Sequence, residues 1–345
     1  MMTLMTQTIQ IADRSLGSGR PAFVIAEAGV NHNGSAELAL RLVEEAAASG
    51  VDCVKFQTFK AERVATPGAP KAAYQLEVTD PGESQIAMLR ALVLTEGAYP
   101  ALLSACAKAG LVFMSTPYNE EDIAFLTGLG VPALKLASIQ AVEPSLLRAA
   151  AQTGKPIVLS TGMCTMDEVK RAVDIVHGTG NRDLILLQCT TNYPSAIADA
   201  NLRAMVTMRD QFGVMVGYSD HTESDTSCIA AIALGACVIE KHFTLDKRMP
   251  GPDQPTSLEP VEMARMMTHI RQTERALGIP GMRRGIVARR AIPEGAIISA
   301  DDLILKRPLS DVPPSAWDRV VGAKARRAIA EGRSLSWDDI EGCTK

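Results

Sequence analysis

The sequence predicts a (β/α)₈ barrel followed by a small β-rich domain, and three observations indicate this. From Ala22 to about Leu277, eight short apolar runs alternate with amphipathic segments. Polar residues follow these runs closely, and after Leu277 the pattern changes to a repeated motif. Eight strand–helix units in about 250 residues are typical of this barrel. We therefore predict a barrel at residues 1–278, a linker at 279–285 and the small domain at 286–345.

The eight apolar runs have the length and composition of buried strands in a parallel sheet. They are Ala22–Ala26, Asp52–Phe56, Leu111–Ser115, Ala133–Leu136, Pro156–Leu159, Leu184–Leu187, Val214–Val216 and Ala236–Ile239. The segments between them show helical periodicity, as at Ala36–Ser49, Glu120–Leu129, Asp167–Val176 and Leu202–Phe212. Several of these segments follow a capping residue and end at a glycine, namely Gly50, Gly130, Gly154 or Gly213, which is typical of helices.

One connection, Lys60–Thr95, is far longer than a βα loop and contains the turn signals PGAP and DPGES. An insertion after a strand lies on the face of the barrel that carries catalytic residues. We therefore expect this segment to form a lid over that face.

The residues at and just beyond the strand ends are unusually polar for a buried sheet. In chain order they are Glu27, Lys55, Gln57, Thr116, Lys135, Ser138, Ser160, Thr161, Gln188, Thr190, Ser219, His221, Glu240 and His242. One strand-end lysine is often only a structural ion pair. Two lysines, carboxylates, histidines and hydroxyls converging on one rim instead predict an enzyme site that binds an anion.

The stretch Val214–Thr244 places His221 and His242 after two neighbouring apolar runs. Their side chains would meet at the same strand ends, where two neutral imidazoles could hold a divalent metal with open positions for water or substrate. The alternative is two polar histidines without a joint role, because a histidine pair without short spacing is a weak signal.

The composition narrows the classes of protein that fit. The chain has 345 residues, 47% of them hydrophobic and 21% charged, with a formal net charge of −4, which argues against a general nucleic-acid binder. Its seven cysteines contain no CxxC pair and are expected to be reduced thiols. We see neither a signal peptide nor a long apolar stretch, and so expect a cytoplasmic protein without a membrane partner.

The C-terminal region contains an internal repeat: Ala291–Leu303 recurs as Ala328–Ile340. Each copy predicts a strand, a Glu-Gly turn, a second strand and a short helix capped by Ser299 or Ser336. The basic turn Lys306-Arg307-Pro308 lies between the copies, and on its own it would be a solvated turn.

Motifs in a fixed order resemble the sialic acid synthase family, which includes N-acetylneuraminate, legionaminate and pseudaminate synthases. They are FVIAEAGVNHNGS, VKFQTFKA, STPYNEEDIAFL, KLAS, STGM, QCTTNYP, GYSDHT and IEKHFTLDK followed by GPD. The repeat-bearing tail resembles the antifreeze-like (SAF) domain of that family, so the resemblance covers nearly the whole chain.

The resemblance implies condensation of phosphoenolpyruvate with the open-chain form of an N-acylated mannose-type sugar, giving a nine-carbon 2-keto acid and phosphate. A divalent metal, Mn²⁺ or Mg²⁺, on His221 and His242 would polarise the aldehyde. Glu27 resembles the family carboxylate that handles water and sugar-ring opening, and Lys55 completes the implied catalytic set.

The resemblance also implies how substrates are held. Phosphoenolpyruvate would be bound by Lys55 and Lys135 with the hydroxyls of Thr116, Ser138, Thr191 and Ser219. Gln57, Tyr193 and Asp253 match positions that contact the sugar. Arg307 resembles an arginine that reaches into the partner subunit's barrel, which implies a domain-swapped homodimer.

The chain departs from the family pattern at Ser138-Ile-Gln140, where Ser-Gly-Glu is common, and at Leu309-Ser-Asp311. An amide at Gln140 offers donors as well as an acceptor, which would favour a substrate acyl carbonyl, and Ile139 would narrow the neighbouring wall. We therefore predict a modified N-acylhexosamine, such as a diacetamido-trideoxy sugar, as the preferred substrate. The alternative is that Gln140 replaces glutamate isosterically and N-acetylmannosamine is used.

Two other functions fit parts of the sequence. A barrel aldolase would use Lys55 or Lys135 as a Schiff base, would ignore chelators and would be trapped by borohydride. A non-catalytic sugar- or ice-binding protein is suggested only by the tail, and it would not need two lysines, two histidines and a carboxylate on one rim.

Overall fold

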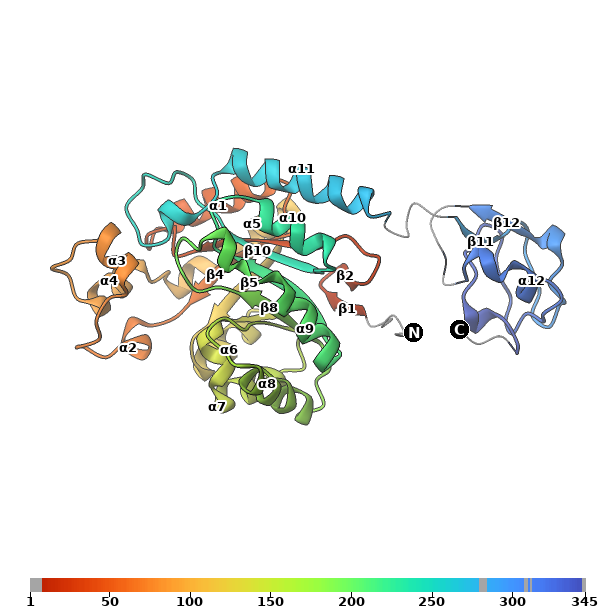
Figure 1. The fold of residues 1–345 in the computed structure, drawn as a ribbon, viewed down its shortest axis with the longest axis horizontal. Coiled ribbons are helices and arrows are strands. Elements are labelled where there is room, and N and C mark those ends of the chain that lie inside the picture. Colours follow the sequence, from red (N-terminus) through yellow and green to blue (C-terminus); the bar gives the residue numbers. More distant parts are fainter. Residues whose placement is uncertain (1–7, 279–283, 307–309, 311, 343–345) are drawn as a thin grey trace. The chain divides into compact units, whose positions relative to one another are not determined.

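The computed structural model describes residues 8–278, 284–306, 310 and 312–342 (Figure 1). Contacts between residues divide the chain into two compact units, Met1–Thr273 and Glu274–Lys345, which are described in turn. The predicted linker at 279–285 lies mostly outside the described residues.

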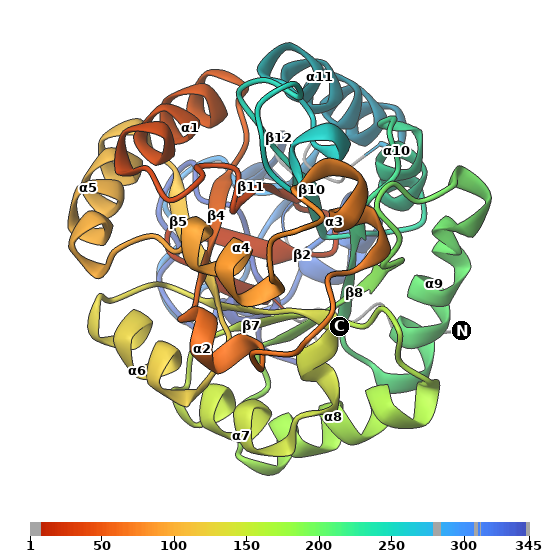
Figure 2. The ribbon, with the colours of Figure 1, turned by 90° about the vertical axis from the view of Figure 1, so that its left-hand side faces the viewer.

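The first unit is the predicted barrel of eight parallel strands. They are β3 (Phe23–Gly29), β4 (Cys53–Thr58), β5 (Val112–Pro117), β6 (Leu134–Leu136), β7 (Ile157–Ser160), β8 (Leu184–Cys189), β9 (Met215–Asp220) and β10 (Val238–His242). The hydrogen-bonded order is β5-β4-β3-β10-β9-β8-β7-β6, and its two ends lie beside each other, so the sheet nearly closes. The (β/α)₈ prediction is confirmed, and Figure 2 shows the ring of helices around the strands.

The outer helices begin and end where capping chemistry predicts. They are α1 (Ala36–Ala48), α5 (Tyr99–Ala109), α6 (Glu120–Gly128), α7 (Pro144–Gln152), α8 (Met166–Gly178), α9 (Leu202–Phe212), α10 (Thr226–Ala233) and α11 (Pro260–Ala276). The side chains of Ser35, Asn119 and Thr165 cap α1, α6 and α8 by accepting a backbone N–H. Gly213 ends α9 in the left-handed conformation, as the sequence predicted.

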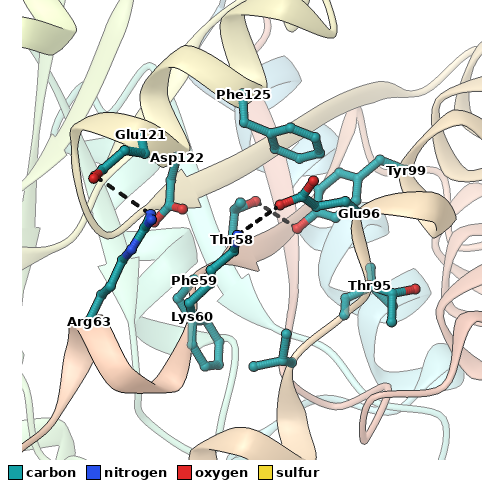
Figure 3. A pocket seen from close by; sticks show the side chains of 12 residues that line it. Thr58, Phe59, Lys60, Arg63, Thr95, Glu96, Tyr99, Glu121, Asp122 and Phe125 are labelled. Atoms are coloured by element: carbon teal, nitrogen blue, oxygen red, sulfur yellow. Dashed lines mark hydrogen bonds and ion pairs between the residues drawn. The ribbon is translucent and has the colours of Figure 1, made fainter.

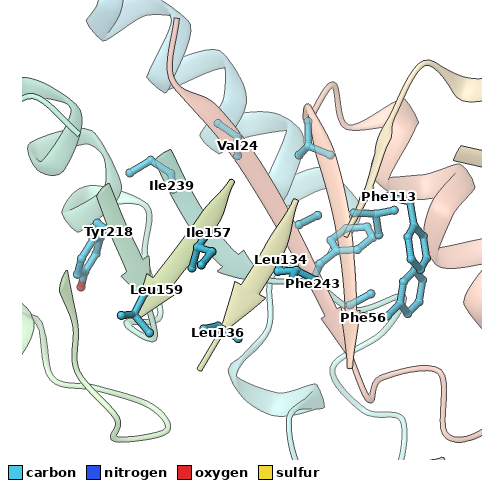
Figure 4. Close-up of a cluster of buried hydrophobic side chains, with 14 of the residues drawn as sticks. Val24, Phe56, Phe113, Leu134, Leu136, Ile157, Leu159, Tyr218, Ile239 and Phe243 are labelled. Atoms are coloured by element: carbon cyan, nitrogen blue, oxygen red, sulfur yellow. The ribbon is translucent and has the colours of Figure 1, made fainter. Parts of the chain in front are cut away.

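The strands carry two layers of apolar side chains, one outside and one inside the ring, because successive residues of a strand face opposite sides. The outward layer packs the strands against the helices and includes Val24, Phe56, Leu134 and Tyr218 (Figure 4). The inward layer closes the lower half of the interior and comprises residues such as Phe23, Ile25, Cys53, Met114, Val158, Leu187 and Val238. The upper half of the interior is therefore lined by the inward-facing residues at the carboxyl ends of the strands.

A β-hairpin that we did not predict precedes the barrel. Strand β1 (Thr8–Ile11) pairs antiparallel with β2 (Arg14–Gly17). Ile9, Ile11 and Leu16 are buried and belong to the inward apolar layer, so the hairpin covers the lower end of the barrel. The alternation of polar and buried residues in Thr8–Ile11 is the sequence signal for it.

The long insertion is folded into short helices: α2 (Ala61–Val64), α3 (Ala73–Val78) and α4 (Gln85–Leu92), followed by the 3₁₀ turn η1 (Glu96–Ala98). Figure 2 shows these helices in front of the barrel opening, as expected for a lid. Met88 and Leu92 of α4 pack with Val30 and Phe59 at the barrel rim and hold the lid there.

One stretch of the described chain, Gln85–Ala109, is long and apolar enough to cross a membrane by length and composition alone. It is divided between α4, η1 and α5. Tyr99, Leu102 and Cys106 of α5 pack in the outward layer of the barrel core. This packing explains the apolar character of the stretch, since core helices of soluble proteins pass the same test.

The second unit contains β11 (Gly285–Ala288) paired with β12 (Leu303–Lys306), and the short helices η6 (Ala300–Asp302), η7 (Pro314–Ala316), α12 (Trp317–Val320) and η8 (Trp337–Asp339). The predicted strands around the Glu-Gly turns are wrong, because only single bridges form there, such as Ile292 with Ile329. These equivalent positions of the two copies pair with each other. Leu303 opposite Ala288 likewise corresponds to Ile340 opposite Ala325.

Candidate active site

The polar residues of the barrel interior continue the inward faces of the strands. Each follows an inward apolar residue by two positions: Ile25 precedes Glu27, Cys53 precedes Lys55, Met114 precedes Thr116, Ala133 precedes Lys135, Val158 precedes Ser160 and Val238 precedes Glu240. Since parallel strands end at the same edge, these side chains meet at the carboxyl ends of the strands. Strand geometry therefore creates one polar mouth above an apolar floor.

Four buried charges form the centre of this mouth. Lys55 Nζ lies 2.6 Å from Glu27 Oε2 and 3.8 Å from Glu240 Oε2. Lys135 Nζ lies 3.5 Å from Glu240 Oε1 and donates a 2.8 Å hydrogen bond to Ser160 Oγ. Glu240 thus links the two lysines, a role that we did not assign to it from the sequence.

Burial and charge act on these groups in opposite directions. Burial raises the pKa of Glu27 to about 7, although the Lys55 ammonium acts to lower it. Burial opposes the charge of Lys55, but the carboxylates of Glu27 and Glu240 keep its pKa above the ordinary value. Burial lowers the pKa of Lys135, and despite burial both lysines keep the pKa of Glu240 low. The mouth therefore contains a carboxyl group, Glu27, that can exchange a proton near neutral pH.

The predicted hydroxyl donors lie around the lysines. Lys55 Nζ donates to Thr116 Oγ1 at 3.0 Å, and Ser219 Oγ donates to Glu240 at 2.9 Å. Ser138 Oγ accepts from the Gly162 N–H at 2.9 Å. A Cβ on Gly162 would lie 2.8 Å from Thr191 Cγ2 and 2.9 Å from Ser138 Oγ, so only glycine leaves this space free. The structure thus brings Thr116, Ser138, Thr191 and Ser219 to one mouth.

The two histidines lie side by side, with ring centroids 5.2 Å apart. His221 Nδ1 is 2.6 Å from the Thr190 carbonyl, which can only accept, so this nitrogen carries the proton. His242 Nδ1 is buried without a hydrogen-bond partner and lies 3.9 Å from Asp253 Oδ2. Burial lowers the pKa of both imidazoles, which keeps them in the neutral form that binds metals.

These features fit a metal ion held only partly by the protein. A neutral imidazole pair and an unpartnered buried nitrogen suit such an ion. Within the described part of the chain, no group of three or more His, Cys, Asp or Glu side chains could hold one. Substrate or water would have to complete the coordination of an ion on His221 and His242.

An aromatic wall lines one side of the mouth. The Tyr193 ring is 4.1 Å from His221 and 5.6 Å from His242, and Tyr74 of α3 stacks on it at 5.1 Å. Tyr118 donates a 3.1 Å hydrogen bond to Gln57 Oε1, and the Gln57 amide donates to Glu27 at 3.2 Å. Sequence reasoning missed Tyr74 and Tyr118, although the position of Tyr74 in the predicted lid was a signal.

Asp253 belongs to the same wall. It is buried, which raises its pKa to about 6, although Lys55 acts to lower it. Its charge in turn contributes to the raised pKa values of Tyr74, Tyr118 and Tyr193, for each of which burial is the main cause. Asp253 therefore lies close to the three tyrosines of this wall, and its contact with a sugar stays a prediction.

The predicted residue Gln140 is bonded to the backbone beside the mouth. Gln140 is buried, with Oε1 accepting from the Ala137 N–H at 2.7 Å and Nε2 donating to the Pro117 carbonyl at 2.5 Å. Its oxygen and one of its two N–H donors are thus bonded to the backbone, while Ile139 is about half exposed. Arg307 lies outside the described residues.

A separate pocket of about 350 Å³ lies where both ends of the lid meet α5 and α6 (Figure 3). Its floor includes Thr58, which faces away from the barrel interior and is hydrogen-bonded to Tyr99. The ion pair Lys60–Glu96, at 3.2 Å, joins the two ends of the lid across it. This pocket is therefore a feature of the lid base, distinct from the polar mouth.

Comparison with known proteins is consistent with this geometry. The chain matches the NeuB family over residues 42–280 and the SAF domain over residues 283–341. It is 42% identical to the N,N'-diacetyllegionaminic acid synthase of Legionella pneumophila, with 94% of this chain and 96% of that protein covered. It is 32% identical to the pseudaminic acid synthase of Campylobacter jejuni, with 90% and 94% covered.

A solved structure has the same fold. The crystal structure of the N-acetylneuraminic acid synthetase of Leptospira borgpetersenii, in complex with citrate, superposes with a TM-score of 0.72 at 32% identity, covering 79% of this chain and 90% of that one. The NeuB match spans more than half of the 345 residues, so the chain belongs to the NeuB family and is an enzyme with a C-terminal SAF domain.

Proposed function

We propose that this protein is a nonulosonate synthase that condenses phosphoenolpyruvate with an N-acylated aldose to give a nine-carbon 2-keto acid and phosphate. The observation that carries the proposal is the mouth itself, where Lys55, Lys135, Glu27 and Glu240 lie with a neutral histidine pair. The synthase names of the similar proteins support the same reaction class.

Phosphoenolpyruvate carries about three negative charges and needs cations and donors in a site from which water is excluded. Lys55 and Lys135 supply the cations, and the hydroxyls of Thr116, Ser138, Thr191 and Ser219 supply neutral donors. Arrival of an anion would compete with Glu27 and Glu240 for the two lysines. The carboxylates thus favour the charged form of both lysines until the substrate arrives.

Glu27 is the group that can move a proton. With a pKa of about 7, it can take a proton from an attacking water and return one to the sugar oxygen at neutral pH. Its hydrogen bond from Gln57 orients it toward the sugar side of the mouth.

A divalent ion, Mn²⁺ or Mg²⁺, bound at His221 and His242 would supply Lewis acidity at the sugar aldehyde. The two residues contribute neutral nitrogen ligands, and the Thr190 carbonyl fixes the tautomer of one of them. Removal of the ion with a chelator is therefore expected to abolish turnover.

The aromatic wall favours a sugar with apolar substituents. Tyr74 and Tyr193 present stacked rings, which suit a 6-deoxy methyl or an acyl methyl better than a hydroxylated side chain. We therefore propose a diacetamido-trideoxyhexose as the preferred substrate, as in a legionaminate synthase. N-acetylmannosamine, the substrate of an N-acetylneuraminate synthase, is the alternative.

Phosphate release from phosphoenolpyruvate with a panel of N-acylated hexoses tests the reaction and the sugar together. We expect release that depends on the sugar and on the metal, without borohydride trapping of Lys55 or Lys135. Trapping together with activity in EDTA would support the Schiff-base aldolase instead. Loss of metal and turnover in His221→Ala and His242→Ala would support the histidine assignment.

The role of Tyr74 is tested by Tyr74→Ser. Loss of the ring should lower kcat/KM for the diacetamido-trideoxy sugar by about tenfold and change that for N-acetylmannosamine less, because a methyl-sized apolar contact contributes about 1–3 kcal/mol. Glu77→Ala, a change at an exposed residue of the same helix α3, is the control. An equal loss for both sugars would contradict a role of Tyr74 in specificity.

We further propose a cytoplasmic, domain-swapped homodimer in which Arg307 enters the partner's mouth. The support is the SAF match and the position of Arg307 within it.

A further inference from the structure

A fully buried ion pair lies behind the mouth, on the outward faces of two adjacent strands. Lys241 of β10 and Asp220 of β9 are ladder partners in the sheet, and their side chains have 0% exposure. Lys241 Nζ lies 2.7 Å from Asp220 Oδ2. His221 directly follows the last residue of β9, and His242 is the last residue of β10.

The Asp220 carboxylate is saturated with donors. Besides Lys241, it accepts from Tyr218 Oη at 3.0 Å, the Thr222 N–H at 2.9 Å, Ser227 Oγ at 2.9 Å and Cys228 Sγ at 3.2 Å. These donors come from the strand, from the following loop and from α10. One carboxylate thus ties three elements to the end of β9.

Lys241 holds the same loop from the other strand. Its ammonium donates to the backbone carbonyls of Thr222 and Ser224 as well as to Asp220. His221 therefore lies between two residues, Asp220 and Thr222, that are both bonded to this network. The segment that carries His221 is fastened to the strand that carries His242.

Stability alone does not explain such a pair. Removing two charges from water is costly, and apolar replacements of buried ion pairs are often neutral or stabilising. The favourable contribution of Lys241 and Asp220 is instead geometric, since charged, directional bonds hold the two strand ends in a single register.

We propose that Lys241 and Asp220 are positioning residues that set the separation and orientation of the two imidazoles for a shared divalent ion. They act through the backbone from the outward face and contact neither substrate nor metal. This inference rests on the proposed metal site at His221 and His242.

The test compares the parent with the double variant Asp220→Asn/Lys241→Met, which removes both charges and leaves neither one unpaired. We expect a folded protein whose Kd for Mn²⁺, measured by electron paramagnetic resonance without substrate, rises about tenfold or more, as for other residues that orient ligands. The kcat should fall, while KM for phosphoenolpyruvate stays within about twofold because the lysines of the mouth are intact.

Asp52→Asn is the matched control, because Asp52 accepts from Arg271 and from the Val24 N–H at the opposite end of the barrel. It should lower the melting temperature without changing Mn²⁺ affinity. Ser227→Ala, which removes one donor to Asp220, should raise the Kd at least about twofold. If the double variant does not fold, the Kd of Ser227→Ala for Mn²⁺ tests the positioning role instead.

Unchanged Mn²⁺ affinity in the folded double variant, or in Ser227→Ala if the double variant fails to fold, would overturn the inference. His221→Ala/His242→Ala separates this failure from failure of the metal site. If the histidine variant binds Mn²⁺ like the parent, the metal site is wrong. If the histidine variant loses Mn²⁺ while Asp220→Asn/Lys241→Met binds it like the parent, only the positioning role is wrong.

Discussion

Burial at the mouth changes the protonation and the hydrogen bonding of polar side chains relative to water. Glu27 lies 2.6 Å from an ammonium and still has a raised pKa, because burial outweighs the attraction. Gln140 illustrates the opposite case, since its polar atoms are both satisfied by backbone groups and are not offered to a ligand. Burial therefore decides which polar groups of the rim are available for chemistry.

The raised pKa of Glu27 predicts a pH-dependent effect on stability. The folded pKa, about 7, exceeds the ordinary value of 4.5, so the native state loses stability as pH rises between these values. Glu27→Gln removes this loss of stability, because the amide does not ionise. Relative to the parent, the variant should gain about 1–3 kcal/mol of unfolding free energy between pH 5 and pH 8.

Urea unfolding of both proteins at the two pH values measures this difference. A difference between variant and parent that is the same at pH 5 and pH 8 would show that Glu27 titrates in its ordinary range. Thr116→Val, which alters the mouth without removing a carboxyl group, should show no such pH dependence.

At the scale of elements, the two copies of the C-terminal repeat use identical bonds. Asp302 accepts from the Ser299 N–H at 2.7 Å and from Arg290 at 2.5 Å. Asp339 accepts from the Ser336 N–H at 2.8 Å and from Arg327 at 2.5 Å. Ser299 and Ser336 are thus the N-cap residues, as predicted, and an aspartate closes each cap. The Ser336 hydroxyl also accepts from the Asp338 N–H, whereas the Ser299 hydroxyl donates to Asp302.

Removing either aspartate should destabilise the second unit. Asp302→Ala or Asp339→Ala should each cost about 1–2 kcal/mol, since a cap and a charged hydrogen bond are lost. Both tryptophans, Trp317 and Trp337, belong to this unit, so fluorescence in urea reports its unfolding alone. The exposed neighbours Asp301 and Asp338 provide alanine controls, and equal effects at these positions would contradict the capping role.

The pH dependence provides a second readout for Asp302. Hydrogen bonds to the serine cap lower its pKa to about 2 from 3.8. Its contribution to stability is therefore present above about pH 4 and is lost as pH falls toward 2. Asp302→Ala should be closer to the parent in stability at pH 2 than at pH 7.

At the scale of the whole molecule, each unit has its own apolar core. The barrel layers draw on residues up to Ile270, while Ile286, Ile298 and Ile340 belong to the core of the second unit. A chain that ends at Ala276 should therefore fold with a barrel melting temperature within a few degrees of the parent.

Turnover should nevertheless fall strongly in this truncated chain if Arg307 completes the mouth. Mixing Arg307→Ala with Glu27→Ala and exchanging subunits should then recover activity, because one mouth of each mixed dimer is intact. Circular dichroism of the truncated chain and assays of the exchanged mixture measure the two effects. No recovery after verified exchange would contradict the swapped arrangement.

The sequence alone determined the barrel, the repeat and most of the mouth. Strand alternation and the common edge of parallel strands are local rules, so Lys55, Lys135 and His242 could be placed together from spacing. Tertiary structure alone decided that Tyr74 stacks on Tyr193, that Glu240 joins two lysines, that Gln140 is used by the backbone and that Asp220 meets Lys241. These outcomes depend on packing between distant segments and on which polar groups are buried, and no local pattern specifies either.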